Sequence, residues 1–174
     1  MPSSAASPSP TPPGDAVPAR RAWMATLAKA PPARLSELAQ GYLAGLPQAA
    51  APRFTMLRKP EAGLVMLRAR AGGSGAPFNM GEMTVTRCTV RLETGVGADG
   101  APIHGAAYIA GRDGAHAALA AKLDALLQAP GHADALRRAV IEPLERERKA
   151  ARAERARQVG ATKVEFFTMV RGED

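Results

Sequence analysis

Arginine is the residue type in this chain that is best suited to bind an anion. A guanidinium group is planar and can donate two parallel hydrogen bonds to the oxygens of a phosphate-like anion. Five arginines are candidate contacts for such an anion or for an acidic partner: Arg70, Arg87, Arg91, Arg112 and Arg171. The formal net charge of +7 also favours an anionic ligand, a nucleic acid or an acidic protein. The ordinary alternative for each arginine is a solvated or salt-bridged side chain.

The histidines and the cysteine give weaker indications of a metal-binding or catalytic site. His104, His116 and His132 do not have the spacing of a zinc motif, and Cys88 is the single cysteine, so no metal site is predicted. His116 follows Asp113, a suitable helix N-cap, and could donate to a phosphate oxygen at the start of that helix; the alternative is that it closes the core or an interface. No nucleophile has an evident base partner, so the catalytic residues stay unknown.

A glycine cluster at 72–75 (Gly-Gly-Ser-Gly) separates two runs that are typical of strands. It could cradle a phosphate, but it lacks the Gly-Lys-Ser/Thr ending of a P-loop, so a flexible strand connection is favoured. Alternation predicts an apolar face and an arginine face in each strand. The apolar faces would hold Val65, Leu67 and Ala69, then Thr86, Cys88, Val90 and Leu92; the opposite faces would hold Met66, Arg68 and Arg70, then Arg87, Thr89 and Arg91. Cys88 is therefore predicted to be a small buried apolar residue.

The remaining elements follow from periodicity and from Pro and Gly breaks. In the N-terminal part they are a helix bearing Trp23, Met24, Leu27 and Ala28 and a second helix from Leu35 to Leu46. In the middle they are a short strand at 54–58, a turn at 60–63 and a strand at 103–110. Further helices are predicted at 113–127, at 136–144 with a candidate kink at Pro143, and at 145–157, and a last strand at 163–170. The predicted fold class is α+β, an antiparallel sheet of about four to five strands with an N-terminal helical hairpin and C-terminal helices packed on it. Residues 1–18, rich in Pro, Ser and Ala, are predicted to be disordered, and 19–174 to form one domain.

Composition limits the class of protein further. Hydrophobic residues make up 46% of the 174 residues but aromatic residues only 4%, so the core must rest on Leu, Val, Met and Ala. A thin core of this kind often depends on partner subunits. One cysteine cannot form an internal disulfide, and no apolar run approaches the roughly 20 residues that span a bilayer. With no apparent signal peptide, the expected location is the cytoplasm.

Two segments near the C-terminus are candidate docking elements. The strand at 163–170 carries apolar residues on both faces, so Phe166, Phe167 and Met169 are candidate interface residues. The helix at 146–157 carries charges of both signs at helical spacing, which favours a solvated helix. Its alternative is a basic nucleic-acid-binding module, although it lacks interleaved aromatic residues.

Several separated motifs together resemble the PhnG family of the bacterial carbon–phosphorus lyase system. They are Arg20-x-x-Trp23-Met24-x-x-Leu27-Ala28, Gly63-Leu64-Val65 leading to Ala69-Arg70-x-Gly72-Gly73-Ser74-Gly75, Val85-Thr86-Arg87 leading to Val90-Arg91-Leu92, Gly111-Arg112-Asp113-x-x-His116-Ala117, and the ending Val164-Glu165-Phe166-Phe167-Thr168-Met169-Val170-Arg171-Gly172. Their order and spacing cover nearly everything after residue 20. The Pro- and Ser-rich start departs from the family pattern.

The resemblance implies a role in the use of phosphonates as a phosphorus source. Members of the family work in a complex with PhnH, PhnI and PhnJ; with PhnH, PhnI and PhnL they are required to transfer the ribose 5-triphosphate of ATP to an alkylphosphonate, releasing adenine. The resemblance thus implies an accessory subunit without a cofactor of its own, which is not expected to be catalytic alone. A homodimer within the complex is compatible with this interpretation, and a nucleic-acid partner is not favoured.

Overall fold

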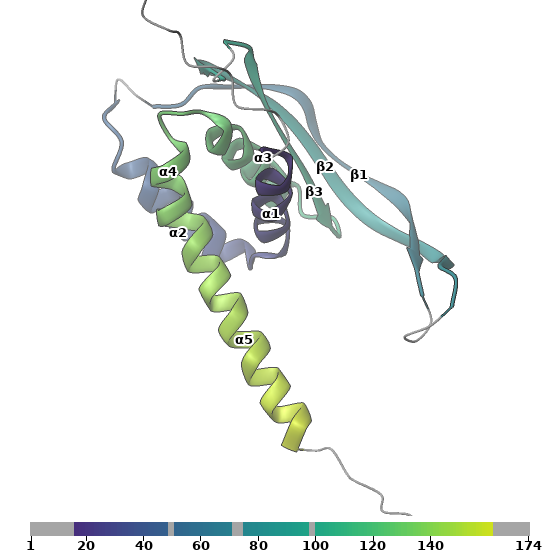
Figure 1. The fold of residues 1–174 in the computed structure, drawn as a ribbon. Helices are drawn as coiled ribbons and strands as arrows, with labels where there is room; N and C mark the ends of the chain where they lie inside the picture. The colour runs from purple at the N-terminus through teal and green to yellow at the C-terminus, as the bar shows by residue number, and fades with distance from the viewer. Residues whose placement is uncertain (1–15, 49–50, 71–74, 98–99, 162–174) are drawn as a thin grey trace, which may run out of the picture.

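The computed structural model describes residues 16–48, 51–70, 75–97 and 100–161. It contains a three-stranded antiparallel sheet in the order β1-β2-β3, with helices packed on one side (Figure 1). The predicted α+β class is confirmed. The described sheet has fewer strands than the four to five expected, because residues 54–69 form one strand and the expected strand at 163–170 lies outside the described residues.

Strand β1 (Phe54–Ala69) continues through Pro60, where the sequence predicted a turn between two short strands. That prediction is wrong. β1 is an edge strand, and its register with β2 (Phe78–Val96) shifts between Met56 and Arg58 and again between Arg58 and Glu61. Proline is tolerated at strand edges and at such bulges, because its missing N–H then leaves no regular ladder bond unmade.

Strand β2 pairs antiparallel with β1 on one side and with β3 (Pro102–Ala110) on the other, which confirms the meander. Its alternation is also confirmed over 86–92. The side chains buried against the helices from β2 and β3 are Thr86, Cys88, Val90, Leu92, Ile103, Ala107 and Ile109. Arg87 and Arg91 lie on the opposite face.

Beyond the end of β3, strands β1 and β2 continue as a two-stranded arm, residues 64–69 and 78–84 (Figure 1). The apolar core face predicted here is wrong, since the side chains of Val65 and Leu67 are 38% and 43% exposed. The sequence pattern is that of a half-buried strand, but among the described residues no third layer covers the arm.

The N-terminal helical hairpin is confirmed as α1 (Ala16–Lys29) and α2 (Pro32–Ala44). α1 begins at Ala16, within the segment 1–18 that was predicted to be disordered, so that boundary was placed too late; residues 1–15 lie outside the described part. Pro32 occupies the first turn of α2, where the N–H that proline lacks has no helical partner in any case. Leu27 and Leu35 are buried and join the two helices to the core.

Helix α3 (Gly114–Gln128) packs across the inner face of the sheet and contacts all three strands. Asp113 is its N-cap, as predicted, because its Oδ1 accepts a 2.8 Å hydrogen bond from the backbone N–H of His116. Ala117, Ala121 and Ala125 are fully buried. Such short side chains allow the helix to approach the strands closely.

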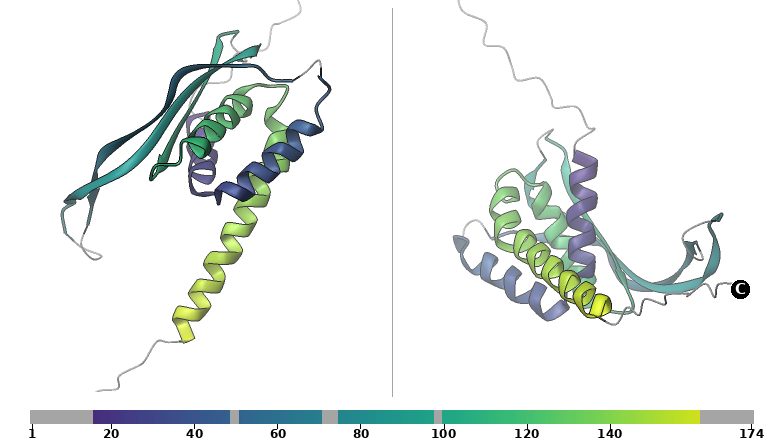
Figure 2. Two further views of the ribbon diagram at one scale, coloured as in Figure 1. Left: turned by 180° about the vertical axis from the view of Figure 1, so that it is seen from behind. Right: turned by 60° about the horizontal axis from the view of Figure 1, so that its bottom comes forward.

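The last described elements are α4 (Ala133–Leu136), a π-helical turn (Arg137–Ile141) and α5 (Glu142–Ala161). They follow one another without a break in the helical backbone. The wide turn ends two residues before Pro143, the predicted kink site. Pro143 has no N–H to donate to the carbonyl one turn earlier, and a π turn is a common way to accommodate such a break. α5 projects away from the sheet and helices (Figure 2), and residues 146–160 are exposed.

Candidate functional site

The face of the sheet turned away from the helices carries three arginines, Arg58 from β1 and Arg87 and Arg91 from β2. The register places Arg87 opposite Tyr108 of β3, and Arg91 opposite His104. We call this surface the arginine face. It confirms that Arg87 and Arg91 share a face, and it adds Arg58, which sequence reasoning missed because the predicted turn at 60–63 hid its register.

Two carboxylates on the arginine face hold these arginines in place. A single oxygen of Glu61, Oε1, accepts from Arg87 Nε at 2.7 Å and from Arg58 Nη1 at 2.8 Å. Glu93 Oε1 accepts from Arg91 Nε at 2.9 Å. Three guanidinium groups therefore face two carboxylates, which leaves a surplus of positive charge.

The neighbouring donors and positive charges lower the pKa values of Glu61 and Glu93. The hydrogen bond from Arg87 is the main reason that the pKa of Glu61 lies below its usual range, and the charge of Arg58 acts in the same direction. The pKa of Glu93 is lowered first by a hydrogen bond from Thr55 and then by Arg91. Both carboxylates therefore stay ionised to lower pH than an ordinary glutamate, and the ion pairs persist with them.

We expect replacement of Arg87 by glutamine to raise the pKa of Glu61 towards its ordinary value, because the strongest donor to the carboxylate is lost. The pKa can be followed by an NMR titration of the Glu61 side-chain carboxyl carbon. In the wild type, the contribution of Glu61 to stability is present above the unfolded pKa and is lost as the pH falls through the lowered folded pKa. Arg58→Gln should produce a smaller rise; equal rises in the two variants would contradict this arrangement.

The ion pairs leave part of each arginine free for another acceptor. Arg87 and Arg91 pair through Nε, and their side chains are 46% and 43% exposed. Their terminal Nη groups can therefore donate to an oxyanion or to a carboxylate on another protein. The arginine face is suited to bind an anion or an acidic surface, although each arginine is also partly satisfied within the chain.

The other predicted contacts are not gathered at this face. Arg70 follows the end of β1 at the far end of the arm, and Arg112 is exposed in the turn between β3 and α3. The candidates Phe166, Phe167, Met169 and Arg171 lie outside the described residues, as does most of the glycine cluster at 72–75. The proposed roles of these residues stay predictions.

His116 has a structural partner. Its side chain is buried, and its Nε2 lies 2.8 Å from the backbone carbonyl oxygen of Leu27. A carbonyl can only accept, so Nε2 carries the proton and donates it. This contact joins α3 to α1 and corresponds to the core-closing alternative for His116, rather than to a donor that is free for a phosphate.

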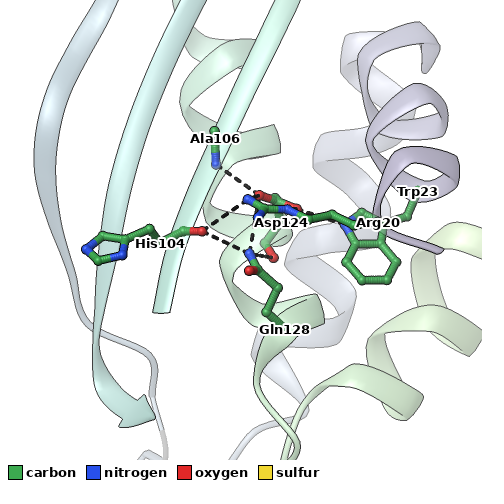
Figure 3. Close-up of polar contacts among 6 residues, drawn as sticks. All are labelled: Arg20, Trp23, His104, Ala106, Asp124 and Gln128. Atoms are coloured by element: carbon green, nitrogen blue, oxygen red, sulfur yellow. Dashed lines mark hydrogen bonds and ion pairs between the residues drawn. The ribbon is translucent and has the colours of Figure 1, made fainter. Parts of the chain in front are cut away.

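A buried carboxylate that the sequence did not single out lies at the contact of α1, α3 and β3 (Figure 3). Asp124 of α3 is fully buried and accepts from Arg20 Nη2 at 2.7 Å and Nε at 3.2 Å. It also accepts from Trp23 Nε1 at 2.8 Å and from the backbone N–H of Ala106 at 2.9 Å. Gln128 Nε2 approaches the same carboxylate at 3.4 Å.

This cluster is a structural connection. The backbone carbonyl of His104 accepts from Arg20 at 3.3 Å and from Gln128 at 2.9 Å, so the outer edge of β3 is tied to both helices. Among the described residues, no buried side-chain polar atom lacks a hydrogen-bond partner. A charged residue in the apolar face of the helix at 113–127 was the signal that could have located Asp124.

The remaining candidates for chemistry have ordinary environments. Cys88 is buried, as predicted, its Sγ donates to the carbonyl of Arg58 at 3.4 Å, and burial raises its thiol pKa. His132 Nδ1 lies 2.8 Å from the hydroxyl of Tyr42. Within the described ranges, no group of three or more His, Cys, Asp and Glu residues could hold a metal ion. Nor is any described helix long and apolar enough to cross a bilayer.

The exposed part of α5 pairs with its own chain. Arg157 forms an ion pair with Glu154, and Arg34 of α2 forms one with Glu147 at 2.8 Å. Glu147 and Glu154 are the two carboxylates among six cations at 146–157, so this part of α5 keeps a positive surplus. It contains no aromatic residue on which a base could stack, and this favours the solvated helix over the nucleic-acid-binding alternative.

Comparison with known proteins gives two results. The family described as "Phosphonate metabolism protein PhnG" matches residues 18–172 of this chain. A relative from Rhizobium meliloti (strain 1021), named alpha-D-ribose 1-methylphosphonate 5-triphosphate synthase subunit PhnG, is 49% identical over 129 residues. That alignment covers 71% of this chain and 74% of the relative.

Proposed function

The chain belongs to the PhnG family of phosphonate metabolism proteins, and on this premise we propose that it is an accessory subunit of the carbon–phosphorus lyase core complex. In this proposal it acts in the cytoplasm with PhnH-, PhnI- and PhnJ-like subunits and, functionally, with a PhnL-like protein. The observation that carries the proposal is the family match over residues 18–172. The name of the relative, a subunit of a ribose 1-methylphosphonate 5-triphosphate synthase, supports the same role.

The proposed reaction transfers the ribose 5-triphosphate of ATP to an alkylphosphonate. An oxygen of the phosphonate forms a bond to C1′ of the ribose as the bond between C1′ and the adenine nitrogen breaks, and adenine leaves with a proton. Both substrates are strongly anionic. The surplus positive charge of the arginine face therefore suits a surface that borders the substrate path or binds an acidic surface of a neighbouring subunit.

We assign no catalytic residue and no cofactor to this subunit. His116 and Asp124 already have structural partners, and the carboxylates beside the arginine face, Glu61 and Glu93, are ion-paired with its arginines. Groups that activate the phosphonate or protonate adenine would then come from the other subunits, and this chain would complete or position their site.

The proposal predicts that a strain lacking this chain fails to grow with methylphosphonate as its only phosphorus source, because the ribose transfer requires the complete complex. The strain should grow normally on inorganic phosphate, and a plasmid copy should restore growth on methylphosphonate. Co-expression with the expected subunits should give a heteromeric complex, measured by size-exclusion chromatography with light scattering. Normal growth of the deletion strain on methylphosphonate would refute the role.

The arginine face can be tested within the same complex. Replacing Arg87 and Arg91 together by glutamine should lower adenine release by the reconstituted complex at least about tenfold, because two charge-assisted contacts are lost. Arg152→Gln on the exposed part of α5 is the matched control and should leave the rate unchanged. A double variant that assembles and reacts like the wild type would exclude the arginine face from both roles.

A further inference from the structure

The arm formed by residues 64–69 and 78–84 exposes a contiguous set of large apolar side chains. Seven of its side chains are between 38% and 63% exposed: Leu64, Val65, Met66, Leu67, Phe78, Met80 and Met83. Single exposed apolar residues are ordinary, but a contiguous set usually marks an interaction surface. A two-stranded ribbon is also only marginally stable alone in water, so the arm gains most from being covered.

Both faces of the arm are apolar. Alternation and the register with β2 place Val65, Leu67 and Met83 on one face, and Leu64 and Met66 on the other. A flat partner surface could cover one of these faces only. A partner that covers both must enclose the ribbon, which requires a groove or cleft with apolar walls.

The backbone of the arm is not suited to extending a sheet. The register between β1 and β2 shifts between Leu67 and Arg68, opposite Gly81, whose φ is +144°. At the base of the arm, Pro60 and two further register shifts interrupt the free edge of β1. Bulges and proline on an edge strand oppose the addition of another strand. Edge-to-edge pairing with a second copy is therefore disfavoured, and recognition must use side chains.

The charge at the far end of the arm indicates the chemistry of the partner. Arg68 and Arg70 lie there, and among the described residues neither has an ion pair. Glu82, opposite Met66, is the single carboxylate of the arm as defined here. A partner that encloses the arm must therefore place carboxylates, not further cations, near its inner end.

We infer that the arm inserts into an apolar groove, with carboxylates at its inner end, on another subunit of the synthase. This inference rests on the proposed function, which supplies a multisubunit complex as the setting. The long, unbranched Met side chains and the Leu side chains of the arm can adapt to fill such a groove. Insertion would remove from water the apolar surface that the isolated chain leaves exposed.

The test replaces two exposed arm residues by a strand-forming polar residue and measures assembly. Leu64→Thr combined with Leu67→Thr keeps the strand propensity of both positions but removes apolar contact on each face. The affinity for the co-expressed remaining subunits, measured by biolayer interferometry, should fall roughly a hundredfold. Val17→Thr, at a comparably exposed position on α1, is the matched control and should not change the affinity. The thermal midpoint of the isolated chain should be similar in all three proteins.

The charged end of the arm is tested by Arg68→Glu. Reversal of this charge should weaken binding about tenfold, and the wild-type affinity should fall with rising salt. Binding that is insensitive to this change would contradict the carboxylates at the inner end of the groove. A photo-crosslinking residue at position 67 should capture another subunit, whereas one at position 152 should not.

The outcomes separate this inference from the proposed function. If the wild type and the double threonine variant assemble equally well, the arm is not inserted and the proposed function stands. If the wild type does not assemble with the other subunits at all, both are refuted. If the wild type forms a dimer that the double variant does not form, the arm binds a second copy of this chain. If the wild type binds phosphatidylglycerol vesicles and the double variant does not, the arm binds a membrane. Either result would refute insertion into a groove on another subunit.

Discussion

Replacing Gly105 by alanine is expected to destabilise the protein by about 3 kcal/mol or more, the upper range for overpacking a rigid core. Gly105 is buried in β3, directly under α3. A Cβ atom there would overlap the backbone carbonyl oxygen of Ala121 and lie 2.7 Å from the backbone nitrogen of Ala125. Both obstacles are helix backbone, so they cannot turn aside as a flexible side chain would. The whole of α3 must move away from the sheet.

Urea unfolding followed by circular dichroism measures this effect, and the thermal midpoint should fall by roughly 10 °C. Gly63→Ala in β1 is the matched control, because a Cβ there meets nothing within 4 Å. Adding Ala125→Gly to the Gly105 variant removes the side-chain part of the overlap and leaves the backbone part. It should therefore fail to restore stability; full recovery would contradict the close approach of backbone to backbone.

The features that sequence patterns predicted well are those decided by neighbouring residues. Asp113 caps α3 because its side chain reaches an N–H three residues on, which the sequence alone determines. The faces of β2 followed from strict alternation, and Cys88 is buried with its apolar neighbours. The helical hairpin followed from its Pro-Pro break. In each case local geometry and burial favour the same arrangement.

The features that sequence patterns missed depend on where distant segments lie. Pro60 is compatible with β1 only because β1 is an edge strand with bulges, and strand order is not encoded locally. The residues of the arm alternate as if they lay on a core, yet β3 ends before it could extend the sheet there. A pattern shows which face a strand can bury, but it does not show whether a partner is present in the same chain.

The candidate site was predictable in part for the same reason. Arg87 and Arg91 share a face by alternation, but their restraint by Glu61 and Glu93 required the register of β1 against β2. Arg70 was grouped with them by type, and the structure places it at the end of the arm. Residue chemistry thus identified an anion-binding type of surface, and the pairing of β1 with β2 determines which residues belong to it.

The buried carboxylate of Asp124 supports the second large effect. Replacing Asp124 by alanine is expected to cost about 3 to 5 kcal/mol, the range for breaking a buried charge pair. The Arg20 side chain is 36% exposed and can return to water, which moderates the loss. Trp23 Nε1 and the N–H of Ala106 cannot do so as easily, and each would lose the acceptor that it has in the wild type. α1 should detach first, since Arg20 and Trp23 are its polar contacts to this carboxylate of α3.

Hydrogen exchange measured by mass spectrometry should show faster exchange in α1 than in β2 of the Asp124→Ala variant, and urea unfolding should give the total loss. Asp134→Asn, an exposed carboxylate in the first turn of α4, is the matched control and should change stability by less than about 0.5 kcal/mol. Trp23→Phe keeps an aromatic ring but removes the donor, and should cost about 1 to 2 kcal/mol in the wild type but much less when combined with Asp124→Ala. Strict additivity of the two changes would show that the indole does not depend on this carboxylate, and the position of α1 would then require another explanation.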